Sequence, residues 1–169
     1  MTDLPSYNVR QATEADLPAL TAFKTPLALH KDRLRDAEAG RLLYLIVEQS
    51  EMIVGFGLLV FERPPNWSDA NDTSRLPDII DLFVRADCRS QGAGSYLIAK
   101  MEETARSRGC PHIYLGVDPV DNPRAHQLYL RLGYSPLQTQ PYRLHWKFVD
   151  SGGDLHEGND WRIDLVKAL

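Results

Sequence analysis

Residues 89–94, "RSQGAG", place two glycines around one alanine just before a helix-like pattern. Glycine lets the backbone turn sharply and approach a bound group closely. The stretch Gly92-Ala93-Gly94 is therefore either a phosphate-binding loop or a tight turn that begins a helix. A Walker loop needs a Lys-Ser/Thr pair after its last glycine, and none follows here, so that class is excluded. A dinucleotide fingerprint needs a third glycine where Leu97 stands, so that class fits poorly.

Two carboxylates, Asp78 and Asp81, lie in the apolar run "PDIIDLFV". Burying a carboxylate in such a run is costly unless it has a partner or a purpose, which favours a function for Asp81 in particular. The alternative is a solvated strand edge or a cap on the preceding loop. The five histidines lack the spacing of metal ligands, and Cys88 and Cys110 are too few for a disulfide framework or a zinc site, so we expect no metal.

Hydrophobic periodicity predicts the elements that must position these residues. Thr13, with Asp16 three residues later, has the pattern of a capping box at a helix start. The predicted elements are a strand at 7–10, a helix from Thr13, a helix over 26–39, a hairpin over 42–61, a strand at 79–84, a helix from the glycine loop to Gly109, a strand at 112–117, a helix over 123–132, and strands at 142–149 and 161–169. Residues 62–78 have no period and are predicted to be a functional lid or disordered.

The succession of strand, glycine loop, helix and strand implies a parallel β-α-β unit within a mixed sheet. The fold class is therefore α/β. At 169 residues, and without a repeat or a linker, residues 1–169 are expected to form one domain.

The glycine loop resembles the R/Q-x-x-G-x-G/A acetyl-CoA signature of the GNAT superfamily of N-acetyltransferases. The segments "VRQATEADLPAL" and "DLFVRADCRSQGAGSYLI" resemble the opening strand and helix of that family and its cofactor-binding strand, loop and helix. The segment "DNPRAHQLYLRLGY" resembles its later N-x-x-A-x-x-x-Y-x-x-x-G-aromatic element, through Asn122, Ala125, Tyr129, Gly133 and Tyr134. The resemblance implies a mixed, centrally splayed β-sheet flanked by helices.

Acetyl-CoA is the cosubstrate that this resemblance implies. The backbone from Ser90 to Ser95 would hold its pyrophosphate at a helix N-terminus. The strand 82–84 would pair through its backbone with the pantetheine arm, which requires the next parallel strand to diverge. The implied cofactor-binding residues are Leu82, Phe83, Val84, Arg89, Ser90, Gln91, Gly92, Ala93, Gly94, Ser95, Asn122 and Tyr129.

Acetyl transfer to an amine needs a donor for the oxyanion, an acid for the leaving thiolate and a base for the amine. The amide of Val84 or its neighbour is the candidate donor. Tyr129 matches the acid of the resembled family, with core packing as the alternative. Some relatives carry the base where this chain has Val117, so that base cannot be transferred. Other relatives keep it on the cofactor strand, which makes Asp81 and Asp78 the candidates.

Composition limits the partners. A net charge of −4, with the arginines spread along the chain, argues against nucleic acid as a partner. No apolar run approaches the roughly 18 residues of a membrane span, and the start of the chain lacks a signal-peptide pattern, so a cytoplasmic location is expected. Trp67, Tyr142 and Trp146 are candidate walls of the acceptor site, and packing in the core or in a homodimer is the alternative for each.

The function expected from these residues is transfer of acetyl from acetyl-CoA to a primary amine by direct attack, without an acyl-enzyme. The sequence leaves the acceptor open among amino acids, polyamines, antibiotics and protein N-termini. Two alternative functions are consistent with the same motifs. One is acyl transfer with another acyl donor or acceptor, and the other is a catalytically silent module that only binds acetyl-CoA.

Overall fold

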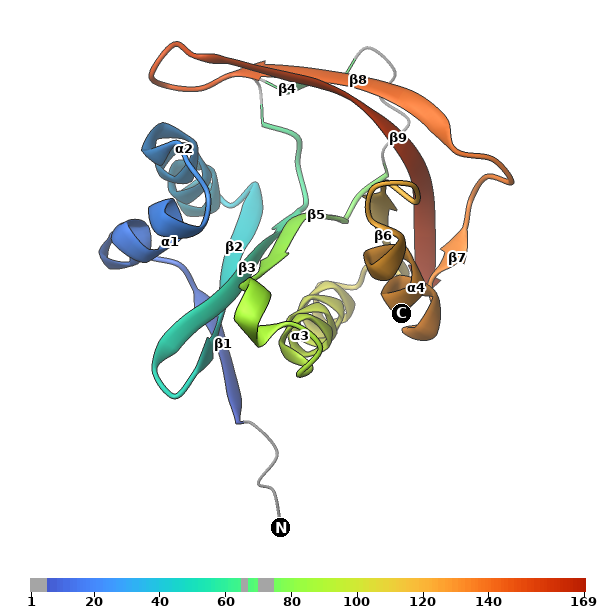
Figure 1. The fold of residues 1–169 in the computed structure, drawn as a ribbon, viewed down its shortest axis with the longest axis horizontal. Coiled ribbons are helices and arrows are strands. Elements are labelled where there is room, and N and C mark those ends of the chain that lie inside the picture. The colour runs from blue at the N-terminus through green and yellow to red at the C-terminus, as the bar shows by residue number, and fades with distance from the viewer. Residues whose placement is uncertain (1–5, 65–66, 70–74) are drawn as a thin grey trace.

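The structure is a computed structural model and describes residues 6–64, 67–69 and 75–169, with the backbone alone for 67–69. Its elements are β1 (Tyr7–Gln11), η1 (Glu14–Asp16), α1 (Leu17–Phe23), α2 (Leu27–Glu38), β2 (Leu42–Gln49), β3 (Met52–Val60), β4 (Trp67–Asp69), β5 (Asp78–Val84), η2 (Ala86–Cys88), α3 (Ala93–Ser107), β6 (His112–Val117), α4 (Pro123–Arg131), β7 (Ser135–Pro136), β8 (Tyr142–Val149) and β9 (Leu155–Ala168). Figure 1 shows their arrangement.

A mixed sheet runs through the molecule in the order β1-β2-β3-β5-β6-β9-β8-β4, with β7 beside β9. The central pair, β5 and β6, is parallel, and the other pairs are antiparallel. The pairing of β5 with β6 reaches Ile79 and Leu115 and ends there, although β5 continues to Val84 and β6 to Val117. The predicted α/β class and the central divergence of the sheet are therefore confirmed.

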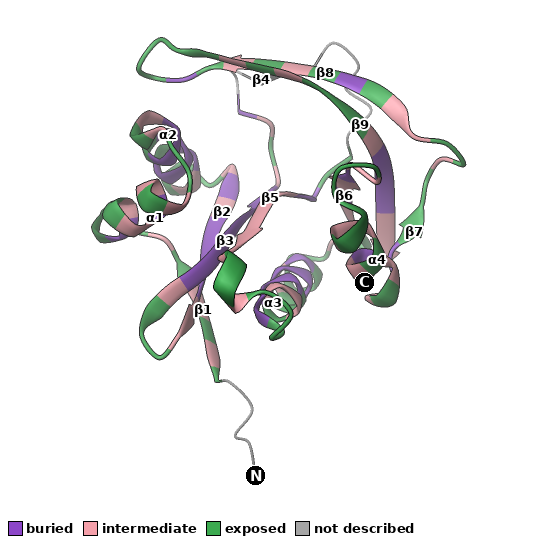
Figure 2. Ribbon diagram, viewed as in Figure 1, coloured by how far each residue is buried: buried purple, intermediate pink, exposed green. Residues whose placement is uncertain are grey.

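Both faces of the central strands are covered, which explains the nearly continuous apolar runs of β2 and β3. On one face, Leu97, Met101 and Ala105 of α3 join a buried cluster with residues of β2, β3 and β5. On the opposite face, Leu20 and Leu34 of α1 and α2 pack in a second cluster. Figure 2 shows buried residues concentrated in the central strands and along α3.

Strands β8 and β9 form a long hairpin that arches over the molecule from the α4 side to the α2 side (Figure 1). We call residues 142–162 the strap, because β9 pairs with β6 only from Ile163 onward and with β8 before that point. Successive side chains of a strand point to opposite faces, so Leu144, Trp146 and Phe148 share one face. Their cross-strand neighbours include Gly158, opposite Trp146. That face is turned toward the body of the molecule.

The tip of the strap is attached to α2. The Ser151 amide donates a hydrogen bond of 2.8 Å to the carboxylate of Asp32 on α2. Asp150 organises the turn itself, because its carboxylate accepts from the amides of Gly152 and Asp154, at 2.8 and 3.0 Å, and lies 2.8 Å from the His156 ring. The strap therefore has supports at both ends.

Three features differ from the sequence-based prediction. Strand β4 lies in the segment predicted to be a lid or disordered, where it pairs with β8; residues 65–66 and 70–74 of that segment lie outside the described part. The two-residue strand β7 was not predicted. Strand β9 begins at Leu155 rather than at 161, because the first half of β9 lies in the strap and lacks the apolar alternation that identifies a strand over a core.

Candidate active site

The glycine loop turns into α3 through two residues with left-handed backbone. Gly92 has φ +99° and Ser90 has φ +63°, and α3 begins at Ala93. The Tyr96 amide donates to the Gly92 carbonyl at 2.9 Å, which is the first helical bond. The amides of the preceding turn thus have no acceptor within the helix and can bind an anion. A Cβ on Gly94 would make only an ordinary contact of 3.5 Å with Val84, so the protein itself leaves space there.

Side chains of the loop hold the loop in shape. The Tyr7 hydroxyl donates to the Gln91 carbonyl at 2.8 Å, and the Gln91 side chain donates to the Asp87 carbonyl at 3.0 Å. Arg89 Nε donates to the Val84 carbonyl at 2.9 Å and so ties the loop to the end of β5. Two residues predicted to bind the cofactor, Arg89 and Gln91, therefore fix the backbone around the helix start.

Strand β5 presents an unpaired edge beside this loop. The Arg85 amide donates to the Val54 carbonyl of β3 at 2.8 Å. Because alternate amides along a strand point to opposite edges, the Val84 amide points away from β3, to the side from which β6 has diverged. Phe83 packs with the cluster on the α1–α2 side, whereas Leu82 and Val84 pack with the α3 side.

Asn122 and Tyr129 lie on α4, across the divergence from β5. Asn122 is the exposed N-cap residue, and its backbone amide donates to the Asp118 carbonyl at 3.0 Å. Tyr129 is 8% exposed, and its ring lies edge-on to that of Tyr134 at a centroid distance of 6.2 Å. Burial raises the pKa of Tyr129 to about 12. Among the described residues, none forms a hydrogen bond with its hydroxyl.

Asp81 lies at an irregularity of β5, with φ +51°, on the α1–α2 side of the sheet. Its carboxylate forms ion pairs with Arg33 and, at 2.6 Å, with Lys24. Burial alone would raise the pKa of Asp81, but the charges of Arg33 and Lys24 outweigh it and hold that pKa below the usual range. A carboxylate held ionised by two cations is a weak proton acceptor.

Asp78 is 1% exposed at the start of β5. Arg63 donates to its Oδ2 at 3.0 Å, Arg162 lies 3.8 Å away, and Oδ1 has no partner in the described part of the chain. Burial raises the pKa of Asp78 to about 6, although both arginines favour its ionised form. The proton affinity of Asp78 therefore suits a base near neutral pH. Its carboxylate, however, is ion-paired with Arg63 and has almost no contact with solvent.

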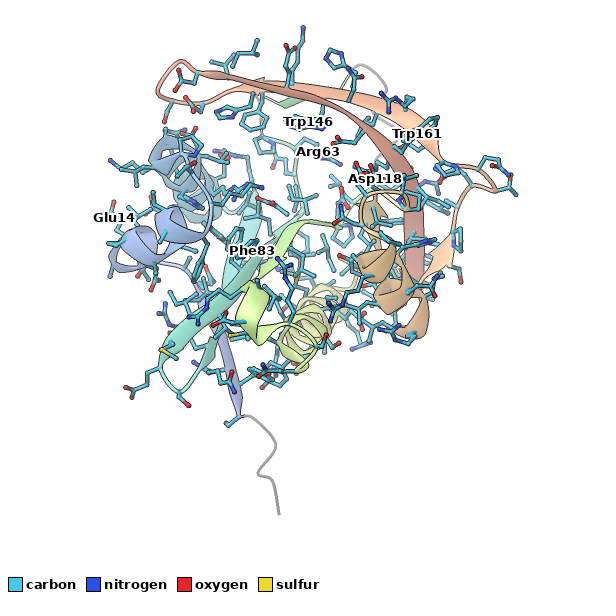
Figure 3. The ribbon with its side chains drawn as sticks, in the orientation of Figure 1. Glu14, Arg63, Phe83, Asp118, Trp146 and Trp161 are labelled. Atoms are coloured by element: carbon cyan, nitrogen blue, oxygen red, sulfur yellow. The ribbon has the colours of Figure 1, made fainter. Side chains whose placement is uncertain are left out.

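A cavity of about 610 Å³ opens where β5 and β6 have separated, beneath the strap. Its floor includes Ile80 and Asp81 of β5 and Gly116 and Val117 of β6, the residues just beyond the last β5–β6 pair. Its other walls include Lys24, Arg33, Arg63, Asp118, Asn122, Trp146, Phe148, Asp160 and Arg162. Figure 3 shows Arg63, Phe83 and Asp118 below the strap that carries Trp146 and Trp161.

The cavity brings together some of the predicted site residues. Asp81, Asn122 and Trp146 line it, whereas Tyr142 is hydrogen-bonded to Asp164 at 2.8 Å, and the side chain of Trp67 lies outside the described part. His126, interpreted from the sequence as a surface residue, is half-buried.

Sequence reasoning missed Arg33, Arg63, Arg162 and Asp118. Only Asp118 had a local signal, because it directly follows the strand at 112–117. The other three are arginines without a motif, and they reach the cavity only through the packing of α2, of the segment after β3 and of β9.

The described residues contain neither a cluster of metal ligands nor a membrane-spanning helix. No group of three or more His, Cys, Asp or Glu side chains there could hold a metal ion. None of the helices that the structure describes is long and apolar enough to cross a membrane.

Comparison with known proteins places this geometry in context. Residues 8–134 match the model of the acetyltransferase (GNAT) family. The chain is 36% identical over 90 residues to the thialysine N-epsilon-acetyltransferase of Bos taurus, covering 53% of this chain and 48% of that protein. It is 32% identical over 112 residues to the mycothiol acetyltransferase of Jonesia denitrificans, covering 66% of this chain and 31% of that protein. The chain thus spans half or less of the length of these relatives.

Solved structures share the fold. A ribosomal-protein-alanine N-acetyltransferase from Brucella melitensis superposes with a TM-score of 0.66 at 20% identity, covering 96% of this chain and 99% of that one. A Salmonella typhimurium protein solved with its cofactor acetyl-CoA superposes with a TM-score of 0.64 at 17% identity, covering 97% and 94%. At these identities the likeness concerns the fold.

Proposed function

Because this chain belongs to the GNAT family of acetyltransferases, we propose that it transfers the acetyl group of acetyl-CoA to a primary amine by direct attack. The observation that carries this proposal is the divergence of β5 from β6 beside the start of α3. An open strand edge and an anion-binding helix start follow this divergence, and the cavity lined by Ile80 and Asp81 of the same strand would hold a second substrate. The names of the curated relatives also support an amine acceptor.

The residues present fit acetyl-CoA. The amides from Ala93 to Ser95, at the start of α3, would donate hydrogen bonds to its pyrophosphate. The open edge of β5 would pair with the amide-rich pantetheine arm. Bound in this way, the cosubstrate supplies an activated acetyl thioester.

Residues of this chain then have defined tasks. The Val84 amide would donate to the carbonyl oxygen as that oxygen gains charge. The amine nitrogen forms a bond to the carbonyl carbon, the carbon–sulfur bond breaks, and its electron pair leaves with sulfur. Tyr129 would donate a hydrogen bond or its proton to the departing thiolate.

The proton lost by the amine needs an acceptor. Asp78 has the higher proton affinity of the two predicted bases, and we propose that it accepts this proton through water, because it does not line the cavity. Asp81, held ionised by Arg33 and Lys24, would act as a fixed negative charge.

The test has two steps. Acetyl-CoA should first raise the melting temperature of the purified chain, and thiol release should then be measured with a panel of primary amines. Stabilisation followed by turnover supports the proposal. Stabilisation without turnover on any amine would indicate a binding module, and the absence of stabilisation would contradict the assignment of the glycine loop.

A further inference from the structure

The cavity beneath the strap carries opposite charges on opposite walls. Helices α1 and α2 lie on one side of β5, and β6 and α4 lie on the other (Figure 1). The first side contributes Lys24 and Arg33 to the cavity, and the second contributes Asp118 and Asp121. An acceptor that fills the cavity would therefore meet cations at one end and carboxylates at the other.

The cationic wall has one positive charge in excess. Lys24 and Arg33 share a single carboxylate, that of Asp81, so the three side chains together carry a charge of +1. Arg33 is 6% exposed, and its Nε and Nη1 have no hydrogen-bond acceptor among the described residues. Its guanidinium lies 5.9 Å from the ring centroids of Tyr44 and Phe56, which hold it in place without neutralising it.

In the described part of the chain, no cation forms an ion pair with the carboxylate wall. Asp118 Oδ1 accepts the amides of Val120 and Asp121, at 2.8 and 2.9 Å, which fixes the side chain. The ion pairs of the described residues leave Asp118 without a cation, whereas Arg63 and Arg162 are balanced by Asp78 and Asp164. The Asp118 carboxylate thus has no ion-pair partner among the described residues on this wall.

The carboxylate wall is the end of the cavity that continues into α4, the helix that carries Tyr129, although Tyr129 itself does not line the cavity. The Asp118 carbonyl accepts the amide of Asn122, and Asn122 begins the helix that carries Tyr129. An ammonium group beside Asp118 would therefore lie on the Tyr129 side of the divergence. Above, Trp146 and Phe148 form an apolar roof, with ring centroids 6.1 Å apart.

From these contacts we infer that the acceptor is a small amino acid-like zwitterion. Its ammonium group faces Asp118, and its carboxylate faces Lys24 and Arg33. This inference rests on the proposed acetyl transfer and names the substrate class of the same site. A diamine is disfavoured because its second ammonium group would face the excess positive charge.

The test compares three acceptors of equal chain length: an ω-amino acid, the n-alkylamine and the diamine, each at two to six carbons. We expect kcat/KM for the preferred ω-amino acid to exceed that of both matched amines by about tenfold. Lys24→Glu changes the local charge from +1 to −1 and should make the diamine the better acceptor. Lys24 and Lys100 are both 44% exposed and ion-paired, so Lys100→Glu is the matched control. We expect the Lys100→Glu variant to prefer the same acceptor as the unmodified chain.

Asp118→Asn tests the other wall. Asparagine keeps an oxygen to accept the two loop amides but removes the charge, so KM for the amino acid should rise while KM for acetyl-CoA stays constant. Equal kcat/KM for all three acceptors, or equal effects of Lys24→Glu on all of them, would overturn the inference and leave acetyl transfer standing. Stabilisation by acetyl-CoA without turnover on any amine would refute the proposed function and the inference together.

Discussion

At the scale of single residues, Tyr129 combines burial with a hydroxyl that has no hydrogen-bond partner among the described residues. With a pKa of about 12 the phenol stays protonated throughout the neutral range, so it is ready to donate. Such a phenol is a weaker acid than a thiol with a pKa of about 8.5. We therefore expect it to stabilise the departing thiolate chiefly as a hydrogen-bond donor.

Tyr129→Phe should lower kcat by about tenfold to a hundredfold, because a hydrogen bond to a charged group such as the departing thiolate contributes about 1.5–3 kcal/mol. Acetyl-CoA affinity should stay nearly constant, because only the departing sulfur needs the hydroxyl. Steady-state kinetics and calorimetric titration measure the two quantities. If affinity collapses together with kcat, Tyr129 is a packing residue instead.

Tyr134→Phe is the matched control. The Tyr134 hydroxyl donates to Glu102 at 3.0 Å, and its ring neighbours that of Tyr129. Its removal should cost about 1 kcal/mol of stability and leave kcat unchanged.

Sequence spacing could predict the residues that belong to motifs. Gly92, Asn122 and Tyr129 stand at fixed intervals, and the structure places them beside the diverging strands. The partners of Asp81 could not be predicted, because Arg33 is 48 residues away in the chain and reaches it only after α2 packs on the sheet. No local sequence pattern predicts an ion pair between residues so far apart in the chain.

At the scale of elements, the two glycines before and within α3 have separate tasks. Gly92 has a left-handed backbone, in which alanine costs about 1–2 kcal/mol. Gly94 stands inside the helix, where alanine is favoured by up to about 1 kcal/mol.

We therefore expect Gly92→Ala to lower both the melting temperature and the affinity for acetyl-CoA. Gly94→Ala should raise the melting temperature and keep the affinity within a few-fold, because its methyl group makes an ordinary contact. Thermal denaturation with and without acetyl-CoA measures both. Equal losses of acetyl-CoA affinity in the two variants would show that binding depends on space for the cosubstrate and not on the backbone conformation of Gly92.

The strap depends on its attachment to α2. Asp32→Ala removes the acceptor of the Ser151 amide and should cost about 1–2 kcal/mol. It should also raise KM for the amine but not for acetyl-CoA, because residues of the strap line the cavity that we propose for the amine.

Limited proteolysis should cut the turn at 150–154 faster in this variant than in the unmodified chain. Asp32→Asn keeps an oxygen acceptor and should restore both properties. A KM for the amine that is the same in all three proteins would argue against a role of the strap in binding.

At the scale of the whole molecule, burial of Asp78 makes stability depend on pH. The carboxyl pKa is raised from 3.8 to about 6 in the folded state, so the native protein binds this proton more tightly than the unfolded chain does. Its contribution is fully present below pH 3.8 and is lost as the pH rises through 6. Buried His30 acts in the opposite sense, because burial lowers its pKa below 6.5.

The difference between the unmodified chain and Asp78→Asn isolates the Asp78 contribution. Between pH 7 and pH 5 the unmodified chain should gain about 1–2 kcal/mol of stability relative to the variant, since one pKa unit corresponds to about 1.4 kcal/mol. Urea denaturation at both pH values measures this. If the unmodified chain instead loses stability relative to the variant on acidification, the arginines, and not burial, determine the pKa of Asp78.

The order of the main elements could be predicted from the residues, because alternating and helical hydrophobic patterns are local properties. The divergence of the sheet was expected only from the resemblance to the GNAT family. The strap could not be predicted in full, since its inner face covers a cavity instead of a core and therefore carries polar residues such as His156 and Asp160. One domain over residues 1–169 stays a prediction.

The position of the strap in the chain has a consequence for how acceptor choice can change. The family match ends at residue 134 and the strap begins at residue 142, so the roof of the proposed amine cavity is encoded after the segment that matches the family model. Under the proposed function, we expect mutations there to alter the choice of acceptor and to leave acetyl-CoA binding unchanged. The strap and its contact on α2 are therefore the segments that we would exchange between relatives, or mutate, to test for new amine specificities.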